Sequence, residues 1–148
     1  MNKILLFLLS LTVFTSCTVT QELEKAKHAN LPAPIGPYSH SVSYGKLIFV
    51  SGQIGLDQKT NSLKPGIEEQ AVQTFENLKT ILHDNHSDLE HVTKTTIFMT
   101  DIKQFDTVNT IYRQYFGNHF PARSTIQVAA LPGNAHIEIE CIAVKKNK

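Results

Sequence analysis

The last strand-like segment constrains the fold more than any other part of the chain. From His136 to Val144 the residues alternate in character, as they do when the side chains of a β-strand point to opposite faces of a sheet. One face is wholly apolar and consists of Ile137, Ile139, Cys141 and Ala143. The other face begins with Glu138 and Glu140 and ends with Ile142 and Val144. The sheet that contains this strand therefore needs cover on both faces.

The rest of the sequence supplies only two helices for that purpose. Apolar residues recur every three or four positions in two segments and predict amphipathic helices at Ile67–Asp84 and Ile102–Phe116. Strand-like segments fall at Ser41–Tyr44, Leu47–Gln53, His91–Thr100 and Arg123–Ala130, the first two joined by a tight turn at Gly45-Lys46. The resulting order is β-β-α-β-α-β-β, an α+β arrangement with both helices on one face of the sheet. We expect another copy of the chain to cover the second face.

The face assignments depend on strict alternation along each strand. In the strand segment His91–Thr100, Val92 is expected on the same face as Lys94 and Thr96, where it would add to the apolar surface that needs cover. If the segments that start at Arg123 and His136 pair as a hairpin, the Arg123 guanidinium and the Glu138 carboxylate approach each other at one end. Taken alone, such a pair is compatible with an ordinary surface ion pair or with a functional site.

The beginning of the chain has the pattern of a secretory signal. Lys3 is followed by an apolar run, Ile4–Phe14, and by the small residues Thr15 and Ser16. The run is shorter than the ~20 residues that a membrane-spanning helix needs. A small pair directly before Cys17 resembles the lipobox of bacterial lipoproteins and predicts acylation of Cys17. The alternatives are a plain secretory signal with a coincidental cysteine, or a buried helix.

These features divide the chain into three parts. We predict a signal peptide at 1–16, a tether at 17–31 and one folded domain at 32–148. The protein is then exported, as a periplasmic or outer-membrane-anchored bacterial lipoprotein, or else secreted.

Charge and cysteine content exclude several classes of protein. The 148 residues carry 14 Lys and Arg against 13 Asp and Glu, and removal of Lys3 with the signal leaves 13 of each. A neutral domain lacks the basic surplus typical of nucleic-acid binding. Two cysteines, Cys17 and Cys141, are too few for a disulfide framework. The seven histidines show no metal-ligand spacing, and we expect no metal site.

Several segments resemble the signature of the RidA/YjgF family. The most specific is Pro121-Ala122-Arg123-Ser124-Thr125-Ile126-Gln127-Val128-Ala129-Ala130-Leu131, followed after five residues by Ile137-Glu138-Ile139. Shorter matches are Ala33-Pro34-Ile35-Gly36-Pro37-Tyr38, Val50-Ser51-Gly52-Gln53-Ile54, Thr93-Lys94-Thr95-Thr96-Ile97-Phe98 and Val108-Asn109. The resemblance covers nearly the whole predicted domain, in the right order.

The resemblance implies a chorismate-mutase-like α+β fold with a mixed six-stranded sheet. It also implies a homotrimer with clefts between neighbouring subunits. The family's deaminases hydrolyse enamines and imines such as 2-aminoacrylate to 2-oxo acids and ammonia, without a cofactor. The family also carries the older names endoribonuclease and translation inhibitor. A trimer that binds small 2-oxo or amino acids without turnover is the second hypothesis, and ribonuclease activity is the weakest because the domain is neutral.

The resemblance also assigns roles to individual residues. Arg123 would bind the substrate carboxylate with its two-pronged guanidinium. Glu138 would activate the attacking water or relay a proton to the leaving nitrogen. Tyr38 would orient the ligand in the cleft. Further binding residues implied by position are Ser51, Gly52, Asn109 and Thr125, the last standing where the deaminases often have cysteine.

The lipobox predicts a specific outcome of fatty-acid labelling in a bacterial host. The chain should take up labelled fatty acid and fractionate with membranes, and Cys17→Ser should abolish both, because acylation needs the thiol of Cys17. Label and membrane fraction that persist unchanged in Cys17→Ser would refute the lipoprotein interpretation.

Overall fold

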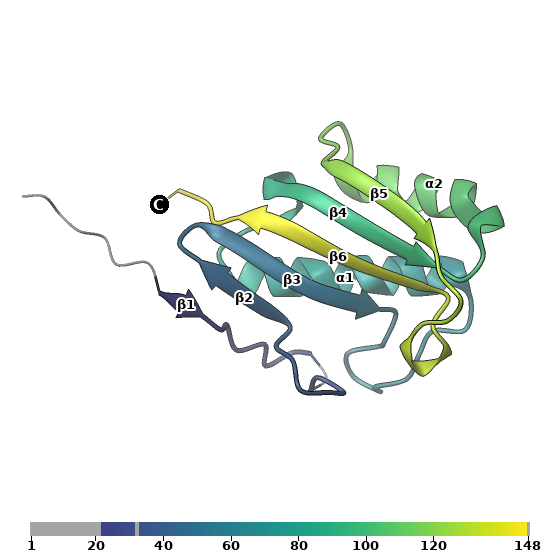
Figure 1. Ribbon diagram of the computed structural model, residues 1–148, viewed down its shortest axis with the longest axis horizontal. Helices are drawn as coiled ribbons and strands as arrows, with labels where there is room; N and C mark the ends of the chain where they lie inside the picture. The colour runs from purple at the N-terminus through teal and green to yellow at the C-terminus, as the bar shows by residue number, and fades with distance from the viewer. Residues whose placement is uncertain (1–21, 32, 148) are drawn as a thin grey trace, which may run out of the picture.

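The chain forms one mixed sheet of six strands with two helices against one face (Figure 1). The computed structural model describes residues 22–31 and 33–147. The strands are β1 (Leu23–Glu24), β2 (Ser41–Tyr44), β3 (Leu47–Ile54), β4 (Val92–Met99), β5 (Ala122–Gln127) and β6 (Ile137–Val144). They lie in the order β1-β2-β3-β6-β4-β5, and only the β4–β5 pair is parallel. The predicted α+β class and the mixed six-stranded sheet are confirmed.

The two predicted helices form the layer behind the sheet in Figure 1. Helix α1 spans Ile67–Asp84 and α2 spans Phe105–Phe116, while Ile102–Gln104 forms a short 3₁₀ turn before α2. Asp101 caps that turn by accepting a hydrogen bond from the Lys103 N–H. The apolar stripes of both helices pack on one side of the sheet. The core between them includes Phe75, Leu78, Leu82, Val108, Tyr112, Ile97, Ile137 and Ile139.

The first hairpin also forms as its sequence predicts. Tyr44 pairs with Leu47, so Gly45 and Lys46 are the two turn residues. Gly45 has a φ of 59°, which a two-residue hairpin turn requires and glycine adopts at little cost.

The hairpin considered for the last two strands does not form. Strand β4 lies between β5 and β6, so Arg123 is aligned with Thr95, and Thr95 with Cys141. The physical reason is the connection through α2, which brings β5 parallel to β4 at the outer edge of the sheet and leaves the other side of β4 for β6. Arg123 and Glu138 are therefore not cross-strand neighbours.

One face assignment on β4 is also wrong. The register shifts between Val92 and Lys94, and Val92 pairs with Ala143 on the helix-covered face. Val92 is only 1% exposed. A bulge lets two residues oppose one and so reverses the alternation at this end of the strand. Val92 adds nothing to the open face.

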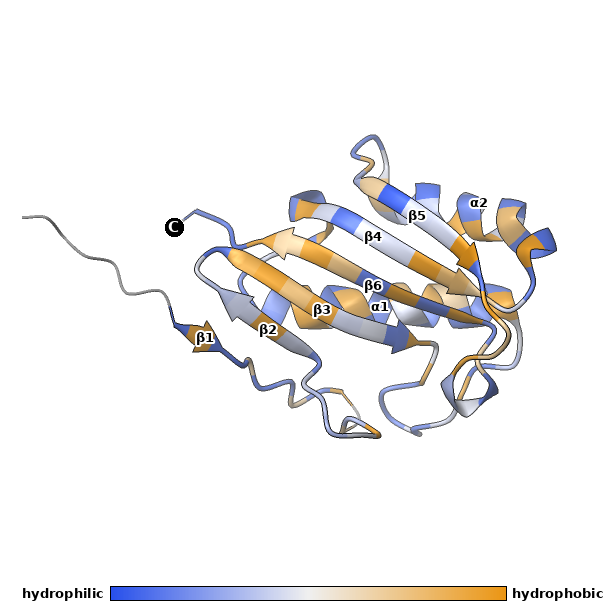
Figure 2. Cartoon of the chain, viewed as in Figure 1, coloured by the Kyte–Doolittle hydropathy of each residue, from blue (hydrophilic) through white to orange (hydrophobic). Residues whose placement is uncertain are grey.

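The open face of the sheet carries a large apolar area, and no element within the described residues covers it. It faces the viewer in Figure 2, where the hydrophobic start of β3 lies beside the hydrophobic end of β6. Leu47 and Phe49 on β3 and Ile126 on β5 are 43%, 45% and 45% exposed. Ile142 and Val144 continue this surface on β6. The expectation that this face requires a partner therefore stands.

Part of the predicted tether is folded against the domain. Leu23–Glu24 pair with Tyr44 and Ser43 as strand β1. The His28 side chain is buried, with ring nitrogens 2.9 Å from Asp84 Oδ2 and 3.1 Å from Ser41 Oγ. Between Leu23 and Leu31 the chain is therefore folded against the domain, in contrast to the predicted tether. Hydrogen bonds from His28 and from the edge of β2 hold this segment, and the weak apolar pattern of its sequence does not reveal them.

The signal and Cys17 lie outside the described residues. Over the part that is described, no helix is long and apolar enough to span a membrane.

Candidate functional site

Glu138 is placed on the open face of the sheet by the pairing of β6 with β3. Its neighbour across the pair is Ile54, and the β3 register shifts between Val50 and Gln53. This irregularity brings the backbone of Gly52 directly against the Glu138 side chain. A methyl group on Gly52 would lie 2.6 Å from Glu138 Cδ and closer still to Oε1. Glycine at this position therefore leaves room for the carboxylate.

The surroundings of Glu138 favour its neutral form. Partial burial, and secondarily repulsion from Glu140, raise the pKa of the Glu138 carboxyl above its ordinary value. Within residues 22–31 and 33–147, no side chain or backbone group makes a hydrogen bond or ion pair with the carboxylate of Glu138. A carboxyl group of this kind is suited to exchanging a proton with a ligand or a water molecule.

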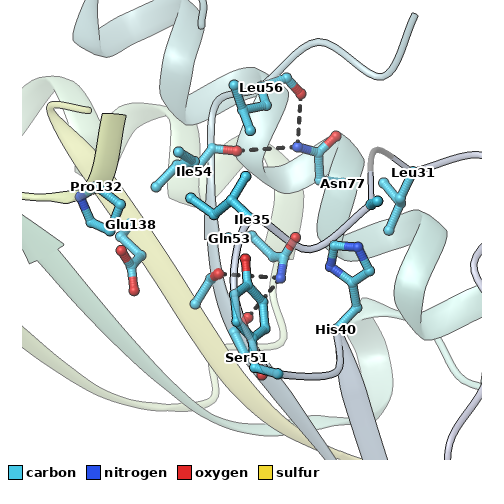
Figure 3. Close-up of a pocket in the computed structure, with 13 residues that line it drawn as sticks. Leu31, Ile35, His40, Ser51, Gln53, Ile54, Leu56, Asn77, Pro132 and Glu138 are labelled. Atoms are coloured by element: carbon cyan, nitrogen blue, oxygen red, sulfur yellow. Dashed lines mark hydrogen bonds between the residues drawn. The ribbon is translucent and has the colours of Figure 1, made fainter. Parts of the chain in front are cut away.

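Glu138 closes one end of a pocket of about 300 Å³ (Figure 3). Tyr38, Ser51 and Gly52 also line it, so four residues assigned by the sequence resemblance meet here. Most of the remaining wall is apolar and is formed by Leu31, Ala33, Ile35, Ile54, Leu56 and Pro132. The pocket thus combines one acidic group with a largely hydrophobic surface, as small-molecule sites commonly do.

Tyr38 and Ser51 are held in place by nearby backbone groups. The Tyr38 N–H donates to the Gly36 carbonyl at 2.8 Å, and the ring meets His40 edge to face at 6.3 Å. The Ser51 hydroxyl donates to the Ser39 carbonyl at 2.8 Å, so its oxygen is left to accept a hydrogen bond. Tyr38 is 44% exposed, which leaves its ring accessible at the pocket mouth.

Sequence reasoning missed three polar residues of the pocket. The Gln53 amide donates to the carbonyls of Ser51 and Gly52, and Asn77 donates to those of Ile54 and Leu56. Both side chains fix the end of β3, and His40 lies beside them in the pocket wall. The only feature of the sequence that could have pointed to Asn77 is the position of its amide side chain next to the apolar stripe of α1.

Arg123 lies on the opposite face of the sheet, toward α2. Its neighbour Thr95 is fully buried under the helices, whereas Glu138 and its neighbour Phe98 face the other way. Arg123 lines a separate cleft of about 470 Å³ together with Asn109, Tyr112, Arg113, Phe120 and Pro121. Within one subunit, therefore, the two residues expected to carry the chemistry do not meet.

Thr125 shares the helix-facing side of β5 with Arg123. Its Oγ1 is buried and has no hydrogen-bond partner among the described residues. An unpaired buried hydroxyl is costly unless something else satisfies it. The residues assigned by the resemblance thus fall into two groups, one around Glu138 and one around Arg123 with Asn109 and Thr125.

The described residues contain no group of three His, Cys, Asp or Glu side chains placed to hold a metal ion. Cys141 is buried, and burial raises the pKa of its thiol to about 12. It is therefore a core residue without nucleophilic character.

Comparison with known proteins identifies relatives over most of the chain. The profile of the family described as endoribonuclease L-PSP matches residues 28–145. The human 2-iminobutanoate/2-iminopropanoate deaminase is 46% identical over 118 residues, which are 79% of this chain and 86% of the human protein. The crystal structure of the Escherichia coli YjgF gene product is 40% identical, with a TM-score of 0.79 over 83% of this chain and 99% of that one. Escherichia coli TdcF with bound serine is 36% identical, with a TM-score of 0.79 over the same shares.

The contact between Gly52 and Glu138 predicts the effect of Gly52→Ala. The added methyl group should push the flexible carboxylate out of its half-buried position toward water. Its pKa should then return toward the ordinary 4.5. Carbon-detected NMR titration of Glu138 measures this, and a thermal melt of the variant checks that the fold persists. A Glu138 titration identical to that of the unmutated protein would contradict the close contact.

Proposed function

The chain belongs to the RidA/YjgF family, also described as endoribonuclease L-PSP, and we propose that it hydrolyses 2-imino acids to 2-oxo acids and ammonia. The proposal rests on the two groups of residues described above, one around Glu138 and one around Arg123. The enzyme class rests on the relatives, because curated proteins about 46% identical over most of the chain are imine deaminases. The substrate and the roles of individual residues are the proposal. The reactive 2-aminoacrylate class and its imine tautomers fit a site with one carboxylate-binding group and one proton-transfer group.

The observation that carries the proposal is the separation of Arg123 from Glu138 on opposite faces of one sheet. Each lines its own cavity, and neither has an ion-pair partner among the described residues. A second copy of the chain can bring its Arg123 cleft to the Glu138 pocket of the first. The exposed apolar surface around Phe49 and Ile126 supplies an area for such a contact. We propose a homotrimer, the assembly that the family resemblance implies, with sites between neighbouring subunits.

The reaction follows from the chemistry of the two groups. The substrate carboxylate would accept paired hydrogen bonds from the Arg123 guanidinium. Glu138, in its ionised form, would take a proton from water as the oxygen attacks the imine carbon. That proton would pass to nitrogen and give a carbinolamine. The proton of its new hydroxyl would then move to nitrogen as the carbonyl forms and the carbon–nitrogen bond breaks, so that ammonia and the 2-oxo acid leave. No electron is transferred, so the reaction needs no redox cofactor.

A binding function without turnover is the second candidate. Thr125 stands where related deaminases often have cysteine, and the structure of the relative TdcF holds serine. Such a protein would use the same Arg123 cleft for a small carboxylate ligand. An endoribonuclease role is less favoured, because the chain is close to neutral, whereas nucleic-acid binding usually relies on a basic groove.

We further propose that the protein is exported and held at a membrane by a lipid on Cys17. This rests on the sequence pattern of residues 1–17. Because strand β1 begins at Leu23, only a short linker would separate that lipid from the domain. The site would then act on imines outside the cytoplasm.

Turnover of freshly generated 2-iminobutanoate tests the proposal. With the unmutated protein, kcat/KM should fall as the pH drops through the pKa of Glu138, because only the ionised carboxylate accepts a proton from water. Since burial raises that pKa, the loss should begin above the usual range for Glu. Glu138→Gln, which cannot act as a base, should lose most turnover and this pH-dependent limb while still binding 2-oxobutanoate, the product.

Arg123 variants separate binding from structure. Arg123→Ala should weaken carboxylate binding by about 2–5 kcal/mol, and Arg123→Lys should restore little of it. Near-normal turnover in both Arg123→Lys and Glu138→Gln would contradict the mechanism. Normal binding of 2-oxobutanoate by an unmutated protein that turns over no imine would favour the binding function.

A further inference from the structure

The guanidinium of Arg123 lies over aromatic rings of α2. Its Cζ is 4.5 Å from the centre of the Tyr112 ring and 5.6 Å from that of Phe105. These distances fall within the range of cation–π attraction. Phe105, Asn109 and Tyr112 are spaced four and three residues apart, so they share one side of α2, the side that meets β5.

The Tyr112 side chain is itself held in place by other buried side chains. Its hydroxyl lies 2.9 Å from the Thr95 hydroxyl, and Thr95 is fully buried on β4. Its ring packs against Phe116 at 4.4 Å and against Phe75 at 5.8 Å, and Tyr112 is only 4% exposed. Burial also raises the pKa of the Tyr112 phenol, so the group stays neutral. The ring is thus a rigid surface for the guanidinium.

The stacked guanidinium keeps its hydrogen-bond donors for a ligand. In the described part of the chain, the Arg123 guanidinium makes no ion pair and donates no hydrogen bond, and it lies over the two rings. A guanidinium that rests on a ring face presents its N–H groups at its edge, where a carboxylate can accept two of them. An aromatic support holds the group without competing for these donors, as a carboxylate partner would.

We propose that Tyr112 and Phe105 are positioning residues that hold Arg123 for two-pronged binding of the substrate carboxylate. Tyr112 acts as the fixed support, anchored through Thr95, and Phe105 adds a second ring at the more exposed side of the cleft. This inference rests on the proposed function for the identity of the ligand. The stacking itself is a property of the unliganded chain and is tested separately.

The first experiment tests the stacking without any ligand. The side-chain Nε–H and Cδ–H signals of Arg123 should be shifted upfield by the rings and should exchange slowly in NMR spectra of the unmutated protein. Tyr112→Phe, which keeps the ring and removes only the hydroxyl, should retain most of the shift. Tyr112→Leu should move these signals toward those of a solvated arginine. Arg123 signals at solvated positions in the unmutated protein would overturn the proposal.

The second experiment measures binding of 2-oxobutanoate by calorimetry. Phe105→Leu and Tyr112→Leu should each weaken binding by about 3- to 30-fold, the range expected for one cation–π contact. Tyr112→Phe should stay close to the unmutated protein. 2-Oxobutanamide, which lacks the charge, should bind weakly and equally to all of them.

Tyr115→Leu is the matched control on the same helix. The Tyr115 ring stacks on Phe75 at 4.6 Å, whereas the Arg123 guanidinium lies over Phe105 and Tyr112. Its loss should lower the melting temperature, as Tyr112→Leu does, without weakening 2-oxobutanoate binding. If Tyr115→Leu weakens binding as much as Tyr112→Leu, the effect is general destabilisation and the positioning role is wrong.

A double-variant cycle separates this inference from the proposed function. Phe105→Leu should weaken binding in the unmutated protein but change nothing in an Arg123→Ala background, because it acts through Arg123. Equal effects in both backgrounds would overturn the positioning role. If the unmutated protein fails to bind 2-oxobutanoate while the NMR shifts persist, the proposed function fails and the stacking stands.

Discussion

The insertion of β6 between β3 and β4 is the constraint on which the rest of the structure depends. Because β6 pairs antiparallel with both neighbours, its apolar face can close the core against α1 while its other face carries Glu138 outward. The same insertion leaves β5 at the edge of the sheet, with Arg123 turned toward α2. This strand order thus places the Glu138 pocket and the Arg123 cleft on opposite faces of the sheet. It also leaves an apolar area of the sheet that no described element covers.

The local features of the fold were readable from the sequence. Helix α1, most of α2 and the turn at Gly45-Lys46 depend on residues close together in the chain, and their patterns indicated them correctly. Strand order was not readable in this way. Consecutive strands often pair, which suggested a β5–β6 hairpin, but a parallel crossover through α2 separates them. Val92 was predicted on the wrong face for a related reason. A bulge reverses which face a residue occupies, and the alternation of polar and apolar residues in the sequence does not show where a bulge occurs.

The site shows the same contrast: its individual residues could be predicted from the sequence, and the contacts between them could not. Resemblance to a family pointed to Tyr38, Ser51, Gly52 and Glu138, and the structure brings these four together around one pocket. The close contact of Gly52 with Glu138 arises from the register of β3 and β6, which residue spacing does not encode. Tyr112 appeared in the sequence only as part of the apolar stripe of α2. That it also supports the Arg123 guanidinium became visible once β5 was placed beside that helix.

The central claim is that Arg123 of one subunit and Glu138 of another form each site, and subunit mixing tests it most directly. Arg123→Ala and Glu138→Gln chains, differently tagged, would be unfolded together and refolded at equal concentrations, with mass spectrometry to confirm mixed trimers. Each variant alone should be nearly inactive. Random assembly restores one complete site in every mixed trimer, so the mixture should recover about one quarter of the unmutated imine hydrolysis activity. Mixed trimers with no more activity than the separate variants would show that the two residues do not act together across the subunit boundary.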